Sequence, residues 1–319
     1  MEEVERTSSS SRRRGVIAAR TGVKVGREDL SEASQREVER LLNSAAGRRT
    51  TTPVRKSFVR TANPESPPPL AQIVSTRGRG GAVPLKLYLG LIRRSSAEPY
   101  DSTLSARRWA ALLDLEDAAH RGARRVNDAI KRLEELRLIE VEVSRGAASR
   151  ITLLREDGSG DPYRPPSERR PAQASRRAKQ QEVELYLQMP DRLWEGYIQR
   201  MAAPGLAMLL ILLAEPESTR DGMWWSTQNF PDWYCIRSSM RTSGTRELES
   251  LGLLRVKKRM LDTPRGGNDD DRDRVRNIYY LAGAALRSET SSAAAVPSST
   301  AKRATVTSGS TGRRLKRAQ

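Results

Sequence analysis

The chain has 319 residues, of which 37% are apolar, and this length allows two compact domains with further segments around them. Its net charge of +18 indicates a polyanionic partner. The single cysteine, Cys235, excludes a disulfide within the chain, and the single histidine, His120, leaves too few ligands for a structural zinc site, which needs about four Cys or His side chains. We therefore expect no metal, no cofactor and no enzymatic activity.

Residues 1–83 are rich in Ser, Arg, Thr and Pro, and they carry 16 basic and 9 acidic side chains. This composition buries too little apolar surface to offset the chain entropy, so we expect a disordered basic N-terminal region. Residues 29–42 are an exception that predicts a helix, either one that binds a partner or a transient solvated one. The N-terminus lacks an apolar secretion signal, and the longest apolar run, 206–214, is too short to span a bilayer. We expect a cytoplasmic, nucleoid-associated protein without membrane contacts.

Residues 84–154 predict a first domain of three helices and a hairpin. Apolar residues at helical spacing predict the helices, and the second one begins after Ser105, whose hydroxyl can accept a hydrogen bond from the first turn. Alternating apolar residues over 139–143 and 151–153 predict two strands with a basic turn between them.

The third helix of this domain has apolar residues on one side and arginines on the other. The arginines and the basic turn can contact base edges and phosphates of duplex DNA. A solvated helix face is the alternative for any charge run, but the turn and hairpin beside this one favour DNA. The candidate DNA-binding residues here are Arg121, Arg124, Arg125, Asn127, Asp128, Arg132, Arg145 and Arg150.

Prolines and charges predict a linker over 155–181, and residues 182–284 then repeat the plan of the first domain. A buried helix covers 204–214, another is capped by Ser226, a third begins at Ser238, and two strands follow. The polar side of the third helix has hydrogen-bonding groups of mixed type, as base reading requires. The candidate DNA-binding residues here are Arg237, Ser239, Arg241, Thr242, Ser243, Arg246 and Lys257.

The loop between the last two strands contains four aspartates, Asp269, Asp270, Asp271 and Asp273. Clustered carboxylates can hold magnesium, but consecutive aspartates point in different directions, so a solvated loop explains them better. The last segment, 285–319, carries seven basic side chains and one acidic one. We expect a disordered basic C-terminal tail that strengthens DNA binding without adding sequence preference.

The run AIKRLEELRLIEVE at 129–142 resembles the winged helix-turn-helix superfamily, in which a Leu-Glu-x-Leu-Gly-Leu-Ile run leads into the wing. Arg137 departs from that pattern, because glycine is usual there, whereas Gly252 fits it in the second domain. The resemblance covers roughly residues 84–284. It implies a mainly α fold with small β wings, in which two winged helix-turn-helix domains are flanked by disordered basic tails.

Two such domains on one chain are similar to plasmid and phage replication initiators. The resemblance implies sequence-specific binding of double-stranded DNA in replication initiation, and a transcriptional regulator (repressor) that binds promoter DNA is the alternative. A DNA-cleaving enzyme is a third class. A rolling-circle nicking enzyme needs paired histidines, so the single His120 excludes it and disfavours a tyrosine recombinase. A homodimer and contacts with the replication or transcription machinery stay open.

Overall fold

The computed structural model describes residues 25–44, 49–61, 63, 65–75, 81–144, 146–166, 185–219, 221–226, 228–260 and 275–286. These residues are mainly α-helical, with three small antiparallel sheets. The aspartate-rich loop, Arg145, residues 167–181 of the predicted linker and all but the first two residues of the predicted C-terminal tail lie outside the described residues. In the described part of the chain, no helix is long and apolar enough to cross a membrane.

The α-helices are α1 Glu32–Leu42, α2 Pro69–Val74, α3 Ala82–Arg94, α4 Ala106–Leu112, α5 Arg121–Glu135, α6 Tyr197–Arg200, α7 Ala203–Ala214, α8 Asn229–Tyr234 and α9 Ser238–Ser250. The short 3-10 helices are η1 Arg27–Asp29, η2 Lys56–Phe58, η3 Asp191–Trp194, η4 Pro216–Thr219 and η6 Gly283–Ala285. The strands are β1 Thr51–Arg55, β2 Asp101–Ser102, β3 Ile139–Glu142, β4 Arg150–Leu153, β5 Tyr186–Pro190, β6 Leu254–Met260 and β7 Val275–Leu281.

The same series of elements occurs twice in the chain. The first copy consists of β1, η2, α2, α3, β2, α4, α5, β3 and β4, and the second of β5, η3, α6, α7, η4, α8, α9, β6 and β7. Among these described elements, only η4 has no counterpart in the first copy. In the first copy β2 pairs with β4, and in the second an isolated bridge between Met223 and Tyr279 takes the same place in the order. The repetition that the sequence predicts is therefore present, and it begins at Thr51 rather than at Pro84.

The predicted helices and hairpins of both copies are present. The Ser226 hydroxyl accepts a hydrogen bond from the N–H of Asn229 (2.9 Å), at the start of α8. Ser226 lies three residues before α8, so the residue next to that helix is Gln228. Ser105 directly precedes its helix, α4, but its hydroxyl makes no capping hydrogen bond. The position of that helix start was predicted correctly, and the role of the hydroxyl was not.

Both copies turn from their last helix into the hairpin in the same way. In the first copy the N–H of Leu138 donates to the carbonyl of Leu133 (3.0 Å), and the corresponding bond of the second copy is 2.9 Å long. Arg137 has φ 55° and Gly252 has φ 68°, so both lie in the left-handed region that ends many helices. Arg137 adopts the conformation that glycine usually supplies, and its departure from the sequence pattern leaves this corner unchanged.

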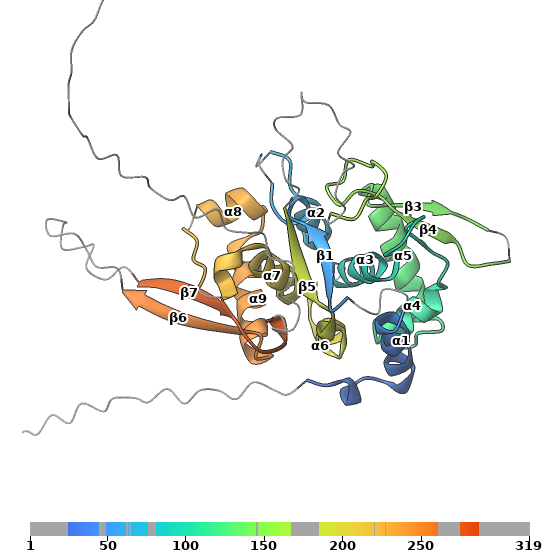
Figure 1. The fold of residues 1–319 in the computed structure, drawn as a ribbon, viewed down its shortest axis with the longest axis horizontal. Helices are drawn as coiled ribbons and strands as arrows, with labels where there is room; N and C mark the ends of the chain where they lie inside the picture. The colour runs from blue at the N-terminus through green and yellow to red at the C-terminus, as the bar shows by residue number, and fades with distance from the viewer. Residues whose placement is uncertain are drawn as a thin grey trace, which may run out of the picture. The chain divides into compact units, whose positions relative to one another are not determined.

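Strands β1 and β5 join the two copies. They pair antiparallel with Pro53 opposite Gln188, and Figure 1 shows them side by side between α7 and α3. Beside the pair, Asp191 accepts a hydrogen bond from the Thr52 hydroxyl (2.7 Å) and pairs with Arg93 (2.9 Å). One apolar core runs through both copies, and the described residues all belong to a single compact unit.

Helix α3 contacts fully buried indoles from both copies. A Cβ atom at Gly90 would lie 3.0 Å from the ring of Trp109 and 3.3 Å from the ring of Trp194. Both tryptophans are fully buried. The missing side chain at Gly90 therefore lets one indole from each copy pack against the same helix.

Residues 25–75 are more ordered than their composition predicts. Helix α1 packs against α4, where Arg108 makes two hydrogen bonds to the carboxylate of Glu37 (3.0 and 2.9 Å), and α2 buries most of its residues near α3. The expectation of disorder over 1–83 is wrong for this part. Its apolar residues are too sparse to form a core of their own, but they are sufficient to extend the core of the first copy.

Arg55 and Glu156 form a buried ion pair, with side-chain exposures of 4% and 0%. Arg55 also donates to the carbonyl of Arg164 (2.6 Å). Burial raises the pKa of Glu156, although the Arg55 charge acts in the opposite direction. This pair fixes the segment after β4 against β1, so residues 155–164 of the predicted linker are part of the folded core.

Lys86 lies between the two copies. It is 6% exposed on α3, and its Nζ donates to the carbonyl of Gln199 at the end of α6 (2.7 Å). Burial lowers the pKa of Lys86 to about 8, and the charge of Arg125 lowers it further, whereas Glu247 and Asp114 raise it. Among the described residues, the Gln199 carbonyl is the one hydrogen-bond acceptor of this ammonium, and burying a charge with so few partners is costly.

We predict that Lys86 makes the protein more stable as the pH rises through the alkaline range. In the unfolded chain lysine has its ordinary pKa, so above about pH 8 the unfolded state binds more protons than the folded state. The free energy of unfolding should gain about 2 kcal/mol between about pH 7 and about pH 9.5 from this group. Urea denaturation at several pH values should show this gain in the wild type and lose it in Lys86→Met. An equal pH dependence in both proteins would contradict it.

Candidate nucleic-acid interface

Helix α5 has one buried side and one exposed side. Gly122, Val126, Ala129 and Leu133 are buried, and the helix packs against α3 and α4. The opposite side presents exposed polar residues, namely Arg121, Arg124, Arg125, Asn127, Asp128 and Lys131. The predicted face therefore exists, and it includes Lys131, which the sequence analysis did not select.

The arginines of α5 differ in how much of their hydrogen-bonding capacity is used. Arg121 pairs with Glu116 (3.1 Å) and lies 3.6 Å from Asp117, whose pKa is lowered because it accepts a hydrogen bond from the N–H of Arg121. Arg132 is half-buried and pairs with Glu135 (3.0 Å). Its guanidinium also donates to the carbonyl of Gln72 in α2 (3.3 Å). Arg132 thus stabilises the contact with α2.

Arg124 and Arg125 make no side-chain hydrogen bond or ion pair to any described residue. Their guanidinium groups are the free donors of this face. On the neighbouring hairpin, Arg150 is exposed and pairs with Asp101 (3.3 Å), and Arg145 lies outside the described residues. On α5, the arginines without a side-chain partner among the described residues are thus the two in the first half of the helix, Arg124 and Arg125.

Helix α9 holds the corresponding place in the second copy. It packs closely on α7, because a Cβ atom at Gly244 would lie only 2.2 Å from the carbonyl oxygen of Pro204. Its exposed side carries Ser239, Thr242, Ser243 and Arg246, as the sequence predicts, and Arg237 is exposed directly before the helix. The Thr242 hydroxyl donates to the carbonyl of Ser238 (3.0 Å), so it is partly used within the helix.

Arg241 points into an aromatic cage instead of the exposed side. Its guanidinium carbon lies 4.6 Å from the ring centre of Phe230 and 5.4 Å from those of Trp225 and Tyr279. The guanidinium also donates to the Tyr279 hydroxyl (3.1 Å). Of the candidate residues on α9, Arg241 is the one whose contacts are mainly structural.

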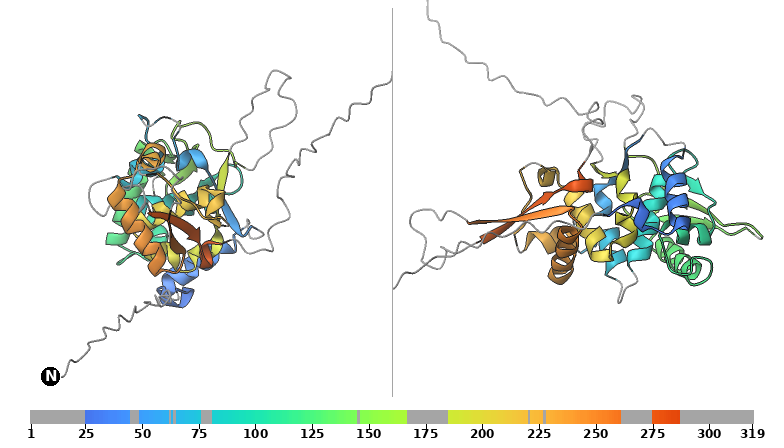
Figure 2. Two further views of the ribbon diagram at one scale, coloured as in Figure 1. Left: turned by 90° about the vertical axis from the view of Figure 1, so that its left-hand side faces the viewer. Right: turned by 90° about the horizontal axis from the view of Figure 1, so that it is seen from below.

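A groove lies between α9 and the β6–β7 hairpin, which are neighbours in Figures 1 and 2. Its volume is about 970 Å³, and its lining comes from α9, both hairpin strands and residues 224–226. We call it the α9–hairpin groove, and its charged lining residues are Arg241, Arg246, Glu249, Lys258 and Arg276.

The hairpin side of this groove differs from the sequence-based prediction. Lys258 lines the groove, whereas the predicted Lys257 does not and lies over the ring of Tyr280 at 5.3 Å. Successive side chains of a strand point to opposite faces, so adjacent lysines cannot share one face. Trp224 and Arg276 were also missed. The bridge of Met223 with Tyr279 places Trp224 at the groove, and the register of β6 with β7 places Arg276 there.

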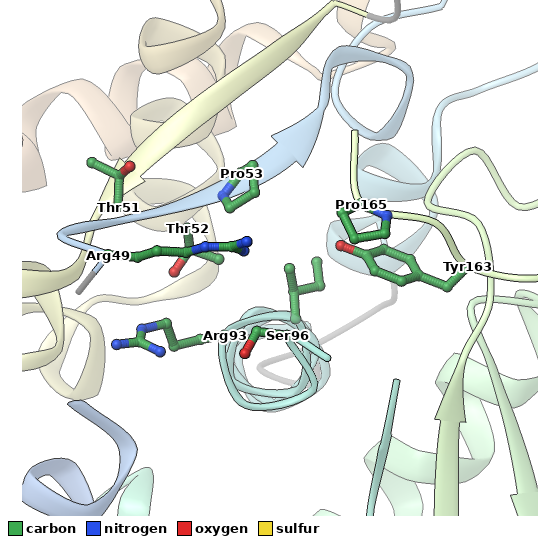
Figure 3. Close-up of a pocket in the computed structure, with 9 residues that line it drawn as sticks. Arg49, Thr51, Thr52, Pro53, Arg93, Ser96, Tyr163 and Pro165 are labelled. Carbon is green, nitrogen blue, oxygen red and sulfur yellow. The ribbon is translucent and has the colours of Figure 1, made fainter. Parts of the chain in front are cut away.

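A second cavity lies between β1, α3 and the segment around Tyr163 (Figure 3). Arg49, Thr52, Arg93 and Ser96 are among its lining residues, but its volume is about 10 Å³. That space holds a single water molecule at most. Among the described residues, no three His, Cys, Asp or Glu side chains gather into a group that could hold a metal ion.

Cys235 lies at the end of α8 with φ 51°. Burial raises the pKa of its thiol, and the nearby Asp232 charge raises it further. A nucleophilic cysteine needs the opposite shift, because the thiolate is the reactive form. This environment favours the protonated, unreactive thiol.

No protein-family model, curated protein or solved structure matches the chain. The chemistry of the two helix faces and the groove is therefore the basis for a function.

We predict that Arg241 contributes to stability, unlike its neighbour Arg246. Replacing Arg241 with Met should lower the free energy of unfolding by about 1–2 kcal/mol, because a partly desolvated cation–π cage is lost. Arg246→Ala removes an exposed side chain and should change it by less than about 0.5 kcal/mol. Urea denaturation of the two variants checks this, and equal stabilities would show that the cage contributes nothing.

Proposed function

We propose that the protein binds double-stranded DNA through two winged helix-turn-helix domains, with α5 and α9 as the recognition helices. The observation that carries the proposal is the repeated order of helix, strand or bridge, two helices and hairpin, with a polar exposed face on the second of the two helices in each copy. The sheet order β2-β4-β3 also supports it. In the winged helix-turn-helix fold a short strand early in the domain pairs with the hairpin that forms the wing, as β2 pairs with β4 here.

The chemistry of the two faces supports DNA as the partner. An α-helix fits the major groove, and a free guanidinium can donate two parallel hydrogen bonds to guanine. Arg124 and Arg125 meet that requirement on α5, and Arg246 meets it on α9. The hydroxyls of Ser239 and Ser243 add groups that can donate and accept.

We further propose that this binding is sequence-specific and serves replication initiation on a plasmid, phage or related element. The described residues belong to the two copies or to the short elements packed on them, so no separate ligand-sensing unit appears in this part of the chain. This supports an initiator over a ligand-controlled regulator. Sites clustered as repeats beside an origin of replication would agree with an initiator, and single or paired sites over promoters would instead indicate a transcriptional regulator.

The test begins with selection of a bound sequence from a random duplex pool at physiological salt. On that duplex, Arg125→Ala and Arg246→Ala should each cost about 1–3 kcal/mol in binding, if each arginine reads a base. On unrelated duplex DNA both variants should bind almost as well as the wild type. Fluorescence anisotropy with labelled duplexes gives both affinities.

Arg36→Ala is the matched control, because Arg36 is an exposed arginine on α1 away from both helices, with a side-chain exposure of 62%. It should leave both affinities unchanged. Equal weakening of specific and unrelated DNA by Arg125→Ala would mean a phosphate contact instead of base reading. The proposed recognition helices would be contradicted if the selection yielded no preferred sequence and neither variant lost DNA affinity.

A further inference from the structure

The α9–hairpin groove combines cations with exposed aromatic surface. Trp224 is 41% exposed although it is a large aromatic residue, and it lines the groove together with Trp225 and Tyr279. Four cationic side chains and one carboxylate are among the lining residues. Such a surface suits an anionic polymer that also carries flat aromatic groups.

Trp224 is held in place by the backbone. The adjacent Met223 exchanges two hydrogen bonds with Tyr279 of β7, both 2.8 Å long. This isolated bridge fixes the backbone directly before Trp224 to the edge of the hairpin. The indole is therefore presented on a rigid element, with little side-chain ordering left to occur on binding.

Arg276 lies over the indole of Trp224, with the guanidinium carbon 3.8 Å from the ring centre. A planar guanidinium and a nucleobase stack on an indole in the same way. The contact with Arg276 thus shows that the Trp224 ring can stack with a planar group, and a nucleobase is such a group. Thr245 adds a hydroxyl at the groove that has no hydrogen-bond partner among the described residues.

The size of the hairpin gives the groove its length. Strands β6 and β7 have seven residues each, whereas β3 and β4 of the first copy have four. The second copy therefore has a longer wall opposite its recognition helix. In a duplex the base faces are stacked on one another, so an exposed indole in such a groove can stack only on bases of an unpaired strand.

We propose that the α9–hairpin groove binds single-stranded DNA, with the backbone along Lys258 and Arg276 and a base stacked on Trp224. This deepens the proposed function and rests on it for the nucleic-acid partner. It gives the second copy a further substrate besides the duplex that α9 contacts. The α5 and α9 helices take the duplex, and the groove beside α9 takes a strand where the duplex is opened.

The test uses the full-length chain with a fluorescently labelled oligothymidylate of about 15 nucleotides, a length that covers one groove of this kind. Binding should quench tryptophan fluorescence, because Trp109, Trp194 and Trp225 are buried and Trp224 is the most exposed indole in the described ranges. Trp224→Ala should remove most of the quenching and weaken binding about 10-fold or more, and Trp224→Phe should weaken it less because a ring remains.

Arg276→Ala should weaken binding of the oligonucleotide and reduce the salt dependence of the affinity, since one phosphate contact is lost. Arg60→Ala is the matched control. Arg60 lies 3.8 Å above the ring of Trp233, the same stacking geometry as Arg276 on Trp224, but it does not line the groove. This control should bind the oligonucleotide as the wild type does.

Two variants separate this inference from the proposed function. Trp224→Ala should keep its affinity for the selected duplex within about twofold, and Arg125→Ala should keep its affinity for oligothymidylate. Suppose that Trp224→Ala binds oligothymidylate as well as the wild type does, and that Arg125→Ala loses only duplex binding. This result would overturn the single-strand site and leave the duplex proposal standing. Binding of polyglutamate as tight as that of oligothymidylate would also overturn it, since the groove would then select charge without bases.

Discussion

The antiparallel pairing of β1 with β5 is the interaction on which the arrangement of the two copies depends. It joins residues 51–55 to residues 186–190, and each strand leads its own copy into the shared core. The Arg93–Asp191 ion pair and the Thr52 hydrogen bond close one side of this joint, and Lys86 reaches Gln199 across it. Buried polar groups of this kind require defined partners, so the two copies are held in one orientation by geometry as well as by apolar contact.

The two copies have the same framework but different surfaces. In the first, α5 presents free arginines beside a short hairpin, and Arg132 instead donates a hydrogen bond to the carbonyl of Gln72. In the second, α9 has hydroxyls and one free arginine, while Arg241 is enclosed by aromatic rings and a long hairpin forms the groove. A repeated fold thus carries two chemically distinct polar surfaces. This difference is the basis for assigning an unpaired strand to the second copy in addition to the duplex.

Much of the helical framework could be predicted from the sequence, because the periodic apolar residues of α5 and the run in α7 are local signals. The folding of β1 and α2 could not be predicted, because Val54, Phe58 and Leu70 are sparse along the chain and form a core only by packing with α3. The exposed face of α5 was predictable from its period, whereas the internal partners of Arg132 and Arg241 lie far away in sequence. The groove was not predictable, because Trp224, Lys258 and Arg276 meet only once the register of the hairpin is known.

The most direct test of the account is photocrosslinking from the two helices to DNA. A photoreactive amino acid would replace Lys131 in α5 or Arg246 in α9 of the full-length chain, and Arg36 in α1 would be the control position. With labelled duplex of the selected sequence, we expect crosslinks from positions 131 and 246 and none from position 36. Retained DNA binding without a crosslink from either helix would show that other parts of the chain hold the DNA, and it would contradict the account.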